Sequence, residues 1–262
     1  NADVSIVVIG EAANLSGEAN SRASLDLPGK QEQLVRAIKQ TGKPFVIVLM
    51  NGRPLTIPWL AENSPAILES WFLGVEAGNA IADVLFGDVN PSGKLPVSFP
   101  RHVGQIPIYY NHKNTGRPPS GEQYTSKYLD VAGTPLYPFG FGLSYTSFRY
   151  DQLRLSSTKL GMIETLNVTV ELKNTGSVFG EEVVQLYVRD RVGSVTRPVK
   201  ELKGFQKIGL KAGESKIVSF TIKPDQLAFY NLEMKRVVEP GDFTVFVGGN
   251  SEDVLSADFN LN

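Results

Sequence analysis

The spacing of hydrophobic residues changes once along this chain of 262 residues, and that change limits the folds it can adopt. In the first half, hydrophobic residues form continuous runs, such as VSIVVI at 4–9 and FVIVLM at 45–50. In the second half they alternate with polar residues, as at 166–172. Continuous runs are typical of strands covered on both faces, and alternation is typical of strands with one face in a core. We therefore expect two domains, over residues 1–145 and 146–262.

Strands alternate with helices in the first of these domains. The pattern predicts strands at 4–9, 45–50 and 66–72 and helices at 29–40 and 75–86. This order predicts a mainly parallel sheet with helices on both faces, an α/β sandwich. The residues expected on the buried faces of the helices are Leu34, Ala37 and Ile38 in the first, and Ala77, Ile81, Val84 and Leu85 in the second.

The second domain contains several short strands with a period of two, separated by turn signals such as Asn174-Thr175-Gly176 and Pro240-Gly241. Strands of this length over about a hundred residues predict a β-sandwich of immunoglobulin or fibronectin type. We find no catalytic constellation there. The charged residues of its central part are expected to be solvated; these are Glu181, Glu182, Arg189, Asp190 and Arg191.

Composition excludes several classes of function. With 26 basic and 27 acidic side chains the net charge is -1, so we expect no nucleic-acid partner. The absence of cysteine excludes disulfides and thiolate chemistry. No apolar run reaches the roughly 18 residues needed to span a bilayer. Because the chain starts at Asn1, without Met or a signal peptide, we expect a piece of a longer polypeptide.

The loop at 10–31 is the strongest candidate for a functional site. It follows the first predicted strand and carries two carboxylates, Glu11 and Glu18, together with Arg22. Folds of this class place their chemistry in loops at the carboxyl ends of strands. A glutamate in such a loop acts as a general acid when its surroundings raise its pKa. The alternative is a solvated loop with ordinary surface acids.

Other kinds of site find no support. The dinucleotide pattern G-x-G-x-x-G is missing, because Gly10 is followed by Glu11 and Ala12. The only histidines, His102 and His112, have no metal-ligating partner at useful spacing. No G-x-S-x-G motif marks a serine nucleophile.

A long polar loop at 100–133 separates the two patterns. It contains Tyr110 and Arg117, side chains that suit the rim of a sugar site because an aromatic face covers C–H surface. Loops of this length are usually functional or wrapped over a neighbour. The alternative is an interdomain linker that its tyrosines hold in place.

Four ordered motifs then resemble a known family. They are SGEANSR with LDLPGKQ, GKPFVIVLMNGRPL, GNAIADVLFGDVNPSGKLPVSFP, and PLYPFGFGLSYTSF. Together they resemble the C-terminal half of glycoside hydrolase family 3 β-glucosidases, most nearly the bacterial periplasmic ones. The text TRPVKELKGFQKI resembles that family's fibronectin type III-like domain. The resemblance covers essentially the whole chain.

The resemblance implies an enzyme in three parts. A TIM barrel, absent from these residues, would supply the nucleophilic aspartate, and the α/β sandwich would supply the acid/base glutamate. By motif the acid/base is Glu18, with Glu11 as the alternative. Arg22 is expected to anchor the loop, because pairing with Glu18 would lower the pKa of an acid. Arg22, Tyr110 and Arg117 are the candidates for the sugar rim.

The activity implied is retaining hydrolysis of terminal β-D-glucosyl residues from oligosaccharides or aryl glucosides, without metal or organic cofactor. The implied partners are the substrate and the barrel; neither nucleic acid nor membrane is among them, and the sequence leaves a homodimer open. The implied location is periplasmic or secreted. Two alternatives stay open: a β-xylosidase or α-L-arabinofuranosidase of the same family, and a non-catalytic sugar-binding or structural module.

Overall fold

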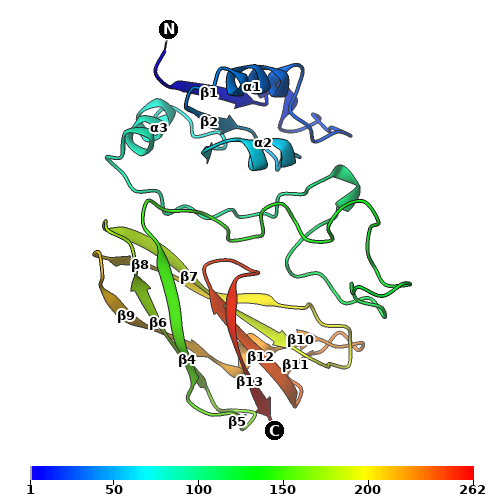
Figure 1. The fold of residues 1–262 in the computed structure, drawn as a ribbon. Helices are drawn as coiled ribbons and strands as arrows, with labels where there is room; N and C mark the ends of the chain where they lie inside the picture. Colours follow the sequence, from blue (N-terminus) through cyan, green and yellow to red (C-terminus); the bar gives the residue numbers. More distant parts are fainter. Residues whose placement is uncertain (1) are drawn as a thin grey trace. The chain divides into compact units, whose positions relative to one another are not determined.

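The computed structural model describes residues 2–262, and the chain divides into two compact units (Figure 1). Unit 1 comprises Asn1–Val89, Phe99–Ile108 and Tyr128–Tyr137, and unit 2 comprises Asn90–Ser98, Tyr109–Lys127 and Pro138–Asn262. The stretch from 90 to 137 therefore belongs partly to each unit, including most of the loop expected at 100–133. It contains the short 3-10 helix η2 (Val103–Gln105).

Unit 1 contains a parallel sheet in the order β1-β2-β3. Its strands are β1 (Ser5–Gly10), β2 (Phe45–Met50) and β3 (Ile67–Glu69). The predicted parallel sheet is confirmed, although β3 is shorter than the predicted strand. Three of its seven predicted residues pair with β2, because the chain turns away at Ser70 and adopts a positive φ of 52° at Trp71.

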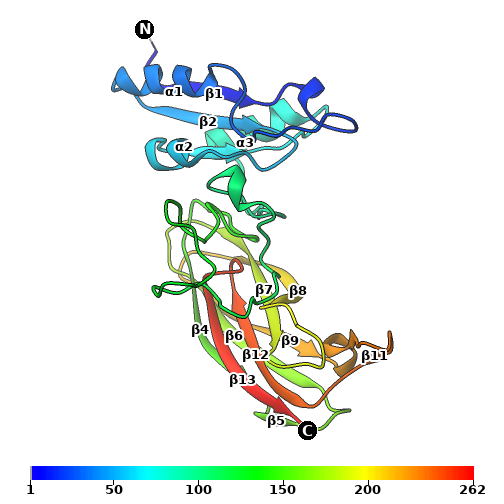
Figure 2. The same cartoon turned by 90° about the vertical axis from the view of Figure 1, so that its right-hand side faces the viewer.

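Helices lie on both sides of this sheet, α1 on one and α2 on the other (Figure 2). Their bounds are α1 (Gln31–Gln40), α2 (Pro58–Asn63) and α3 (Ala77–Phe86), and a 3-10 turn η1 (Ala13–Leu15) follows β1. Helix α2 was not predicted from the sequence. This helix has six residues and begins with Pro58, in the first turn, where proline is tolerated because its missing N–H would have no partner in the helix.

The buried face of α1 differs from the predicted one. Val35 is fully buried and Ile38 is partly buried, whereas Leu34 is 52% exposed and Ala37 is also exposed. The prediction was wrong for Leu34 and Ala37. Residues 31, 35 and 38 share one face of a helix, and so do residues 34, 37 and 38. The Gln31 side chain makes two hydrogen bonds with the backbone of Gly10, and these bonds hold the first of the two faces against the sheet.

Unit 2 is a β-sandwich of a five-stranded sheet, β5-β13-β12-β7-β8, and a three-stranded sheet, β4-β6-β9. The strands are β4 (Phe148–Leu155), β5 (Lys159–Leu160), β6 (Leu166–Asn174), β7 (Gly180–Asp190), β8 (Glu201–Leu210), β9 (Ser215–Ile222), β12 (Gly241–Gly248) and β13 (Val254–Leu261). A small hairpin of β10 (Phe229–Tyr230) and β11 (Arg236–Val237) follows the 3-10 helix η3 (Pro224–Leu227).

The alternating residues identified in the sequence form the core of this sandwich. Leu166, Val168, Val170 and Leu172 of β6 are at most 1% exposed. They join one hydrophobic cluster with the inward residues of β7, β9 and β12. The predicted all-β second domain is therefore confirmed.

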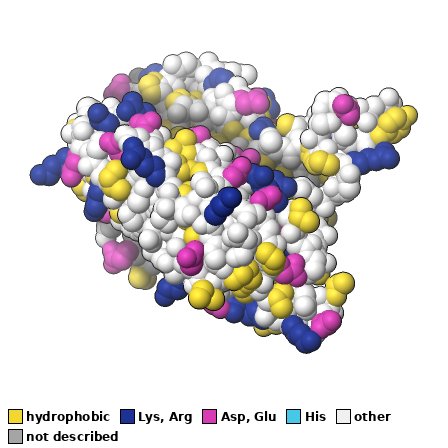
Figure 3. All heavy atoms as spheres, turned by 90° about the horizontal axis from the view of Figure 1, so that it is seen from below, with side chains coloured by type: hydrophobic (Ala, Val, Ile, Leu, Met, Phe, Trp, Pro, Cys, Tyr) yellow, Lys and Arg dark blue, Asp and Glu magenta, His cyan; other side chains and the backbone are white. Residues whose placement is uncertain are grey.

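Two of the carboxylates expected to be solvated are buried instead, so that expectation was wrong for Glu182 and Asp190. Glu182 pairs with Lys94 at 2.9 Å and accepts a hydrogen bond from Tyr150. Asp190 faces Arg197 at 3.5 Å. On the face of the molecule seen in Figure 3, basic and acidic side chains are interspersed, and no large field of one charge forms there.

Candidate functional site

Three loops leave the carboxyl edge of the parallel sheet in unit 1, one after each strand. Parallel strands end at the same edge, so residues distant in sequence meet there. The first loop is fixed at its start by Gly10, whose φ is 137°. A Cβ at Gly10 would lie 1.8 Å from the carbonyl oxygen of Met50, so only glycine allows β1 and β2 this close an approach at their ends.

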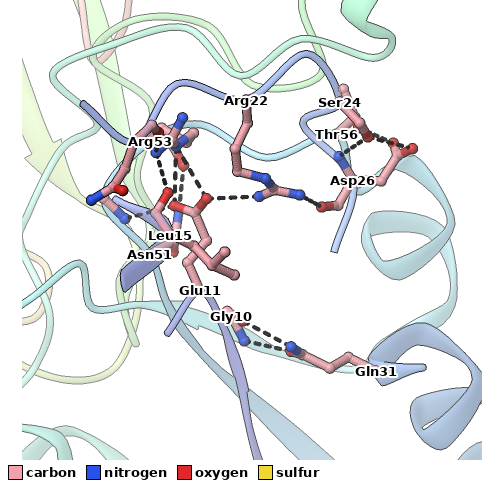
Figure 4. A network of polar contacts seen from close by, with 12 residues as sticks. Gly10, Glu11, Leu15, Arg22, Ser24, Asp26, Gln31, Asn51, Arg53 and Thr56 are labelled. Carbon is pink, nitrogen blue, oxygen red and sulfur yellow. Dashed lines mark hydrogen bonds and ion pairs between the residues drawn. The ribbon is translucent and has the colours of Figure 1, made fainter. Parts of the chain in front are cut away.

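Glu11 is a buried anchor of this loop. Its side chain reaches no solvent, and its carboxylate lies 2.7 Å from Arg22 Nη1 and 3.1 Å from Arg53 Nε. The backbone N–H of Gly52 donates to it at 3.3 Å. Figure 4 shows these groups converging on Glu11 from the loops after β1 and β2. With both oxygens taken up by these donors, the Glu11 carboxylate serves to hold the loop and is not presented to a substrate.

Arg22 also fixes the return of the loop. Besides Glu11, its guanidinium donates to the carbonyl oxygen of Asp26 at 2.8 Å. The Asp26 carboxylate in turn accepts from the Thr56 hydroxyl, and an isolated β-bridge joins the same two residues. The loop is therefore attached at both ends to the segment that follows β2.

Glu18 has the opposite environment, because it is exposed at the tip of a tight turn. The N–H of Asn20 donates to Gly17 O at 3.2 Å, with positive φ at Gly17 and Ala19. Arg53 Nη2 donates to the carbonyl oxygens of Leu15 and of Asn20, which flank this turn. One side chain thus holds the turn from both sides while the Glu18 carboxylate projects freely.

Gly52 is the point where the three loops meet. A Cβ on Gly52 would lie 2.0 Å from Ser16 Oγ in the first loop and 2.9 Å from the Phe72 ring in the third. The Phe72 side chain is itself 48% exposed beside this contact. The turn that carries Glu18 therefore rests on a residue with no side chain.

Sequence reasoning missed Glu69, the last residue of β3. Burial raises the pKa of its carboxyl to about 7, against smaller lowering effects from the Trp71 N–H and the Asn51 amide. The sequence did contain a signal for this residue. Glu69 is a single glutamate directly after the apolar run AIL, at the position where a strand ends at the carboxyl edge of the sheet.

The remaining rim candidates lie in unit 2. The half-buried ring of Tyr110 stacks on Phe139 with 4.4 Å between centroids, and its hydroxyl accepts from the N–H of Leu202 at 3.3 Å. Arg117 is exposed, and its carbonyl oxygen accepts from the N–H of Ser126. Sugar binding by either residue stays a prediction.

Comparison with known proteins decides the family. The Glycosyl hydrolase family 3 C-terminal domain matches residues 1–145, and a Fibronectin type III-like domain matches residues 182–251. The chain belongs to glycoside hydrolase family 3. A Periplasmic beta-glucosidase of Salmonella typhimurium is 53% identical over 99% of this chain and 34% of its own length. A Beta-xylosidase of Formosa agariphila is 51% identical over 96% of this chain and 34% of its own length.

A solved structure of this family has the same fold. The beta-glucosidase from Listeria innocua in complex with glucose matches 100% of this chain and 37% of its own, with a TM-score of 0.94 at 48% identity. The glycoside hydrolase family 3 chain described above thus spans about a third of the length of these relatives. None of the helices within residues 2–262 has the length and hydropathy of a membrane span.

Proposed function

We propose that this family 3 chain supplies the general acid/base of a retaining β-glucosidase, with Glu18 as the acid/base residue. The observation that carries the proposal is the contrast between the two glutamates of one loop. Glu11 is paired with Arg22 and Arg53, whereas Glu18 lies exposed on a turn that Arg53 holds at both ends. Glu18 is therefore the carboxyl group of this loop that is free to reach a substrate.

In this mechanism Glu18 acts twice. It first donates its proton to the glycosidic oxygen as the bond to the anomeric carbon breaks, and a nucleophilic carboxylate takes the sugar as a covalent glycosyl-enzyme. Glu18 then removes a proton from the water that hydrolyses this intermediate. Retention requires the two carboxyl groups to be about 5–5.5 Å apart. We assign the nucleophile to an aspartate on a TIM barrel that lies outside this chain.

The barrel also provides the surroundings that Glu18 lacks here. A general acid works best with a pKa near the working pH. Closing the site against a barrel would remove water from Glu18 and disfavour its charged form. Arg22, Tyr110 and Arg117 are each proposed as a sugar contact.

The substrate class follows from the relatives. Several are named beta-glucosidases, and the Listeria innocua enzyme has been solved with glucose and, as a mutant, with laminaribiose. We propose short β-glucan oligosaccharides or aryl β-glucosides. The second candidate is a β-xylosidase or α-L-arabinofuranosidase. The 51% identity to the Beta-xylosidase of Formosa agariphila supports this candidate. A periplasmic or secreted location follows the Salmonella typhimurium relative. A homodimer stays a prediction.

The decisive experiment uses the full-length polypeptide that carries this chain. Glu18→Gln should reduce kcat on cellobiose by about 10²–10⁴-fold, the usual worth of a general acid. On 2,4-dinitrophenyl β-glucoside, whose leaving group needs no proton, bond cleavage should persist and the glycosyl-enzyme should accumulate. Azide should then accelerate turnover of Glu18→Ala and give β-glucosyl azide.

Glu62→Gln, an exposed glutamate on α2, is the matched control and should behave as the parent. Equal loss on both substrates, without azide rescue, would contradict the role of Glu18. The ratio of kcat/KM for 4-nitrophenyl glucoside and xyloside chooses between the two enzyme candidates. Absence of turnover on any glycoside, with sugar binding retained, would favour a non-catalytic binding module.

A further inference from the structure

Two buried acceptor atoms lie without a donor at the carboxyl edge of the sheet, beneath the loop of Glu18. They are Oε2 of Glu69, at the end of β3, and Oδ1 of Asn51, directly after β2. Within residues 2–262 neither has a hydrogen-bond partner. Glu69 Oε1, by contrast, accepts from the N–H of Trp71 at 3.0 Å. Buried polar atoms without partners are rare and costly, so this pair needs an explanation.

The orientation of Asn51 is fixed by its other atom. Nδ2 donates to the carbonyl oxygen of Arg53 at 2.7 Å, which leaves Oδ1 as the end still in need of a donor. The Asn51 side chain also lies close enough to the Glu69 carboxyl to influence its pKa. Two neighbouring acceptors are both satisfied if one of them carries a proton. An ionised Glu69 would instead leave a charge on a carboxyl whose Oε2 is buried without a donor.

We propose that Glu69 is a positioning residue that stays protonated in the working protein and donates through Oε2 to Asn51 Oδ1. The neutral carboxyl then makes two hydrogen bonds. The one given to Asn51 joins the ends of β2 and β3, and the one accepted from Trp71 holds the turn that follows β3. The second of these holds the backbone of Trp71, whose φ of 52° is unfavourable for a bulky residue.

Electrostatics supports this protonation state. Burial is the largest influence on Glu69 and raises its pKa from 4.5 to about 7, with the Trp71 N–H and the Asn51 amide acting in the opposite direction. Among the described residues, no charged side chain contributes to this shift, and the nearby ions Glu11 and Arg53 are paired with each other.

The consequence reaches the acid/base loop through Arg53. Asn51 holds the backbone of Arg53, and the Arg53 guanidinium holds Leu15 and Asn20 on either side of the Glu18 turn. A proton on Glu69 therefore fixes the turn after β2, and this turn fixes the position of Glu18. This part of the inference rests on the proposed role of Glu18, whereas the protonation of Glu69 does not.

The sign of the pH dependence follows from linkage. Between about pH 4.5, where the unfolded carboxyl titrates, and about pH 7, the folded protein binds one more proton than the unfolded one. The stabilisation from Glu69 is therefore complete below the lower value, declines as the pH rises, and is lost above the upper value.

The test compares Glu69→Gln with the parent in the full-length polypeptide. Glutamine imitates the protonated acid, since its amide donates to Asn51 and accepts from Trp71 without titrating. The difference in Tm between variant and parent should be small near pH 5 and should rise in favour of the variant up to about pH 8. Near pH 6 the variant should keep kcat within about twofold.

A second measurement does not depend on activity. In the parent at pH 6, Glu69 should give an infrared carbonyl stretch of a protonated carboxyl that disappears as the pH rises through about 7, and difference spectra should show this component missing from Glu69→Gln and from Glu69→Met. Glu62→Gln, in which an exposed acid is changed, should keep the band and the pH dependence of the parent.

A band that is unchanged in Glu69→Gln, or a Tm difference that is constant with pH, would overturn the proposal. A drop in kcat for Glu69→Met that is larger on unactivated than on activated glucosides, with Glu69→Gln close to the parent, supports positioning of Glu18. A loss on unactivated glucosides that is as large in Glu69→Gln as in Glu69→Met would instead make Glu69 the proton donor and overturn the positioning role. Failure of the Glu18 assignment would appear in the Glu18 variants alone and leave the infrared result intact.

Discussion

Arg22 Nη1 lies 2.7 Å from Glu11 Oε1, in a site where the Glu11 side chain has no exposed surface. This ion pair gives different roles to two glutamates, Glu11 and Glu18, which lie seven residues apart in one loop. It takes Glu11 out of reach of any substrate and uses it to hold the loop. The next glutamate, Glu18, is left exposed on the turn that the pair supports.

Glu11 should therefore matter mainly for stability. Glu11→Ala leaves Arg22 and Arg53 part-buried without their counter-ion, and removal of one partner of a buried pair costs about 3–5 kcal/mol. Because both guanidinium groups retain some solvent, we expect the lower end of that range. Urea unfolding measures it. Glu18→Ala, at an exposed position, should stay within about 0.5 kcal/mol of the parent; a larger loss for Glu18→Ala than for Glu11→Ala would reverse the two roles.

Gly52→Ala should displace the Glu18 turn. The new methyl group would meet Ser16 Oγ at 2.0 Å and the Phe72 ring at 2.9 Å, so Ser16 and its neighbours must move. We expect kcat on an unactivated glucoside to fall at least about tenfold, because small displacements of a catalytic group are costly. Steady-state kinetics of the full-length polypeptide measures this.

Gly78→Ala is the matched control for that substitution. Gly78 lies in α3, and nothing lies within 4 Å of the added methyl group. It should leave kcat unchanged and stabilise the protein by about 0.5–1 kcal/mol. If both glycine variants keep full activity, the packing at Gly52 does not position the loop.

Arg53→Lys should weaken the hold on the acid/base turn although it keeps the charge. A lysine ammonium is a point charge on a flexible stem, whereas the planar guanidinium of Arg53 contacts Glu11, Leu15 O and Asn20 O together. We expect kcat to drop by about tenfold with little change in KM, measured on an unactivated aryl glucoside. Arg36→Lys, on the exposed side of α1, should leave kcat unchanged. An equal drop in kcat in both variants would point to a general effect of replacing arginine with lysine.

The β-sandwich depends on a buried ion pair that ties the segment around Lys94 to β7. Lys94→Met leaves the buried Glu182 carboxylate without its cation and should destabilise unit 2 by about 3 kcal/mol. In the double variant Lys94→Met with Glu182→Met, both charges are gone and much of that loss should be recovered. Thermal unfolding of both single variants and the double variant measures the coupling. If the loss in the double variant equals the sum of the losses in Lys94→Met and Glu182→Met, the pair contributes no coupling.

Periodicity alone predicted most of the architecture. The continuous run at 45–50 became β2 with the predicted bounds, and the alternating residues of 166–172 became the core side of β6. Both signals survive because a fully covered strand and a half-covered strand need different residue patterns, whatever their neighbours are. The error at Leu34 arose where two helical faces had similar hydrophobicity and a polar contact of Gln31 decided between them.

Charged residues were harder to predict than apolar ones. Glu182 and Asp190 read as surface charge because each stands among other charged residues. Their burial depends on Lys94 and Arg197, and Lys94 lies 88 residues from Glu182 along the chain. Sequence spacing carries no information about such a pairing, because an ion pair needs proximity and no particular period.

The sequence by itself determined the change from an α/β to an all-β pattern, the parallel sheet with its helices, and a loop with two candidate carboxylates at the carboxyl edge. It could not decide how those carboxylates differ, since Glu11 and Glu18 are chemically identical and share one loop. The tertiary structure decided that by bringing Arg53, from the loop after β2, against Glu11 and both ends of the Glu18 turn. The acidity of a carboxyl depends on burial and on charges within a few ångströms, and these are properties of the fold and not of the local sequence.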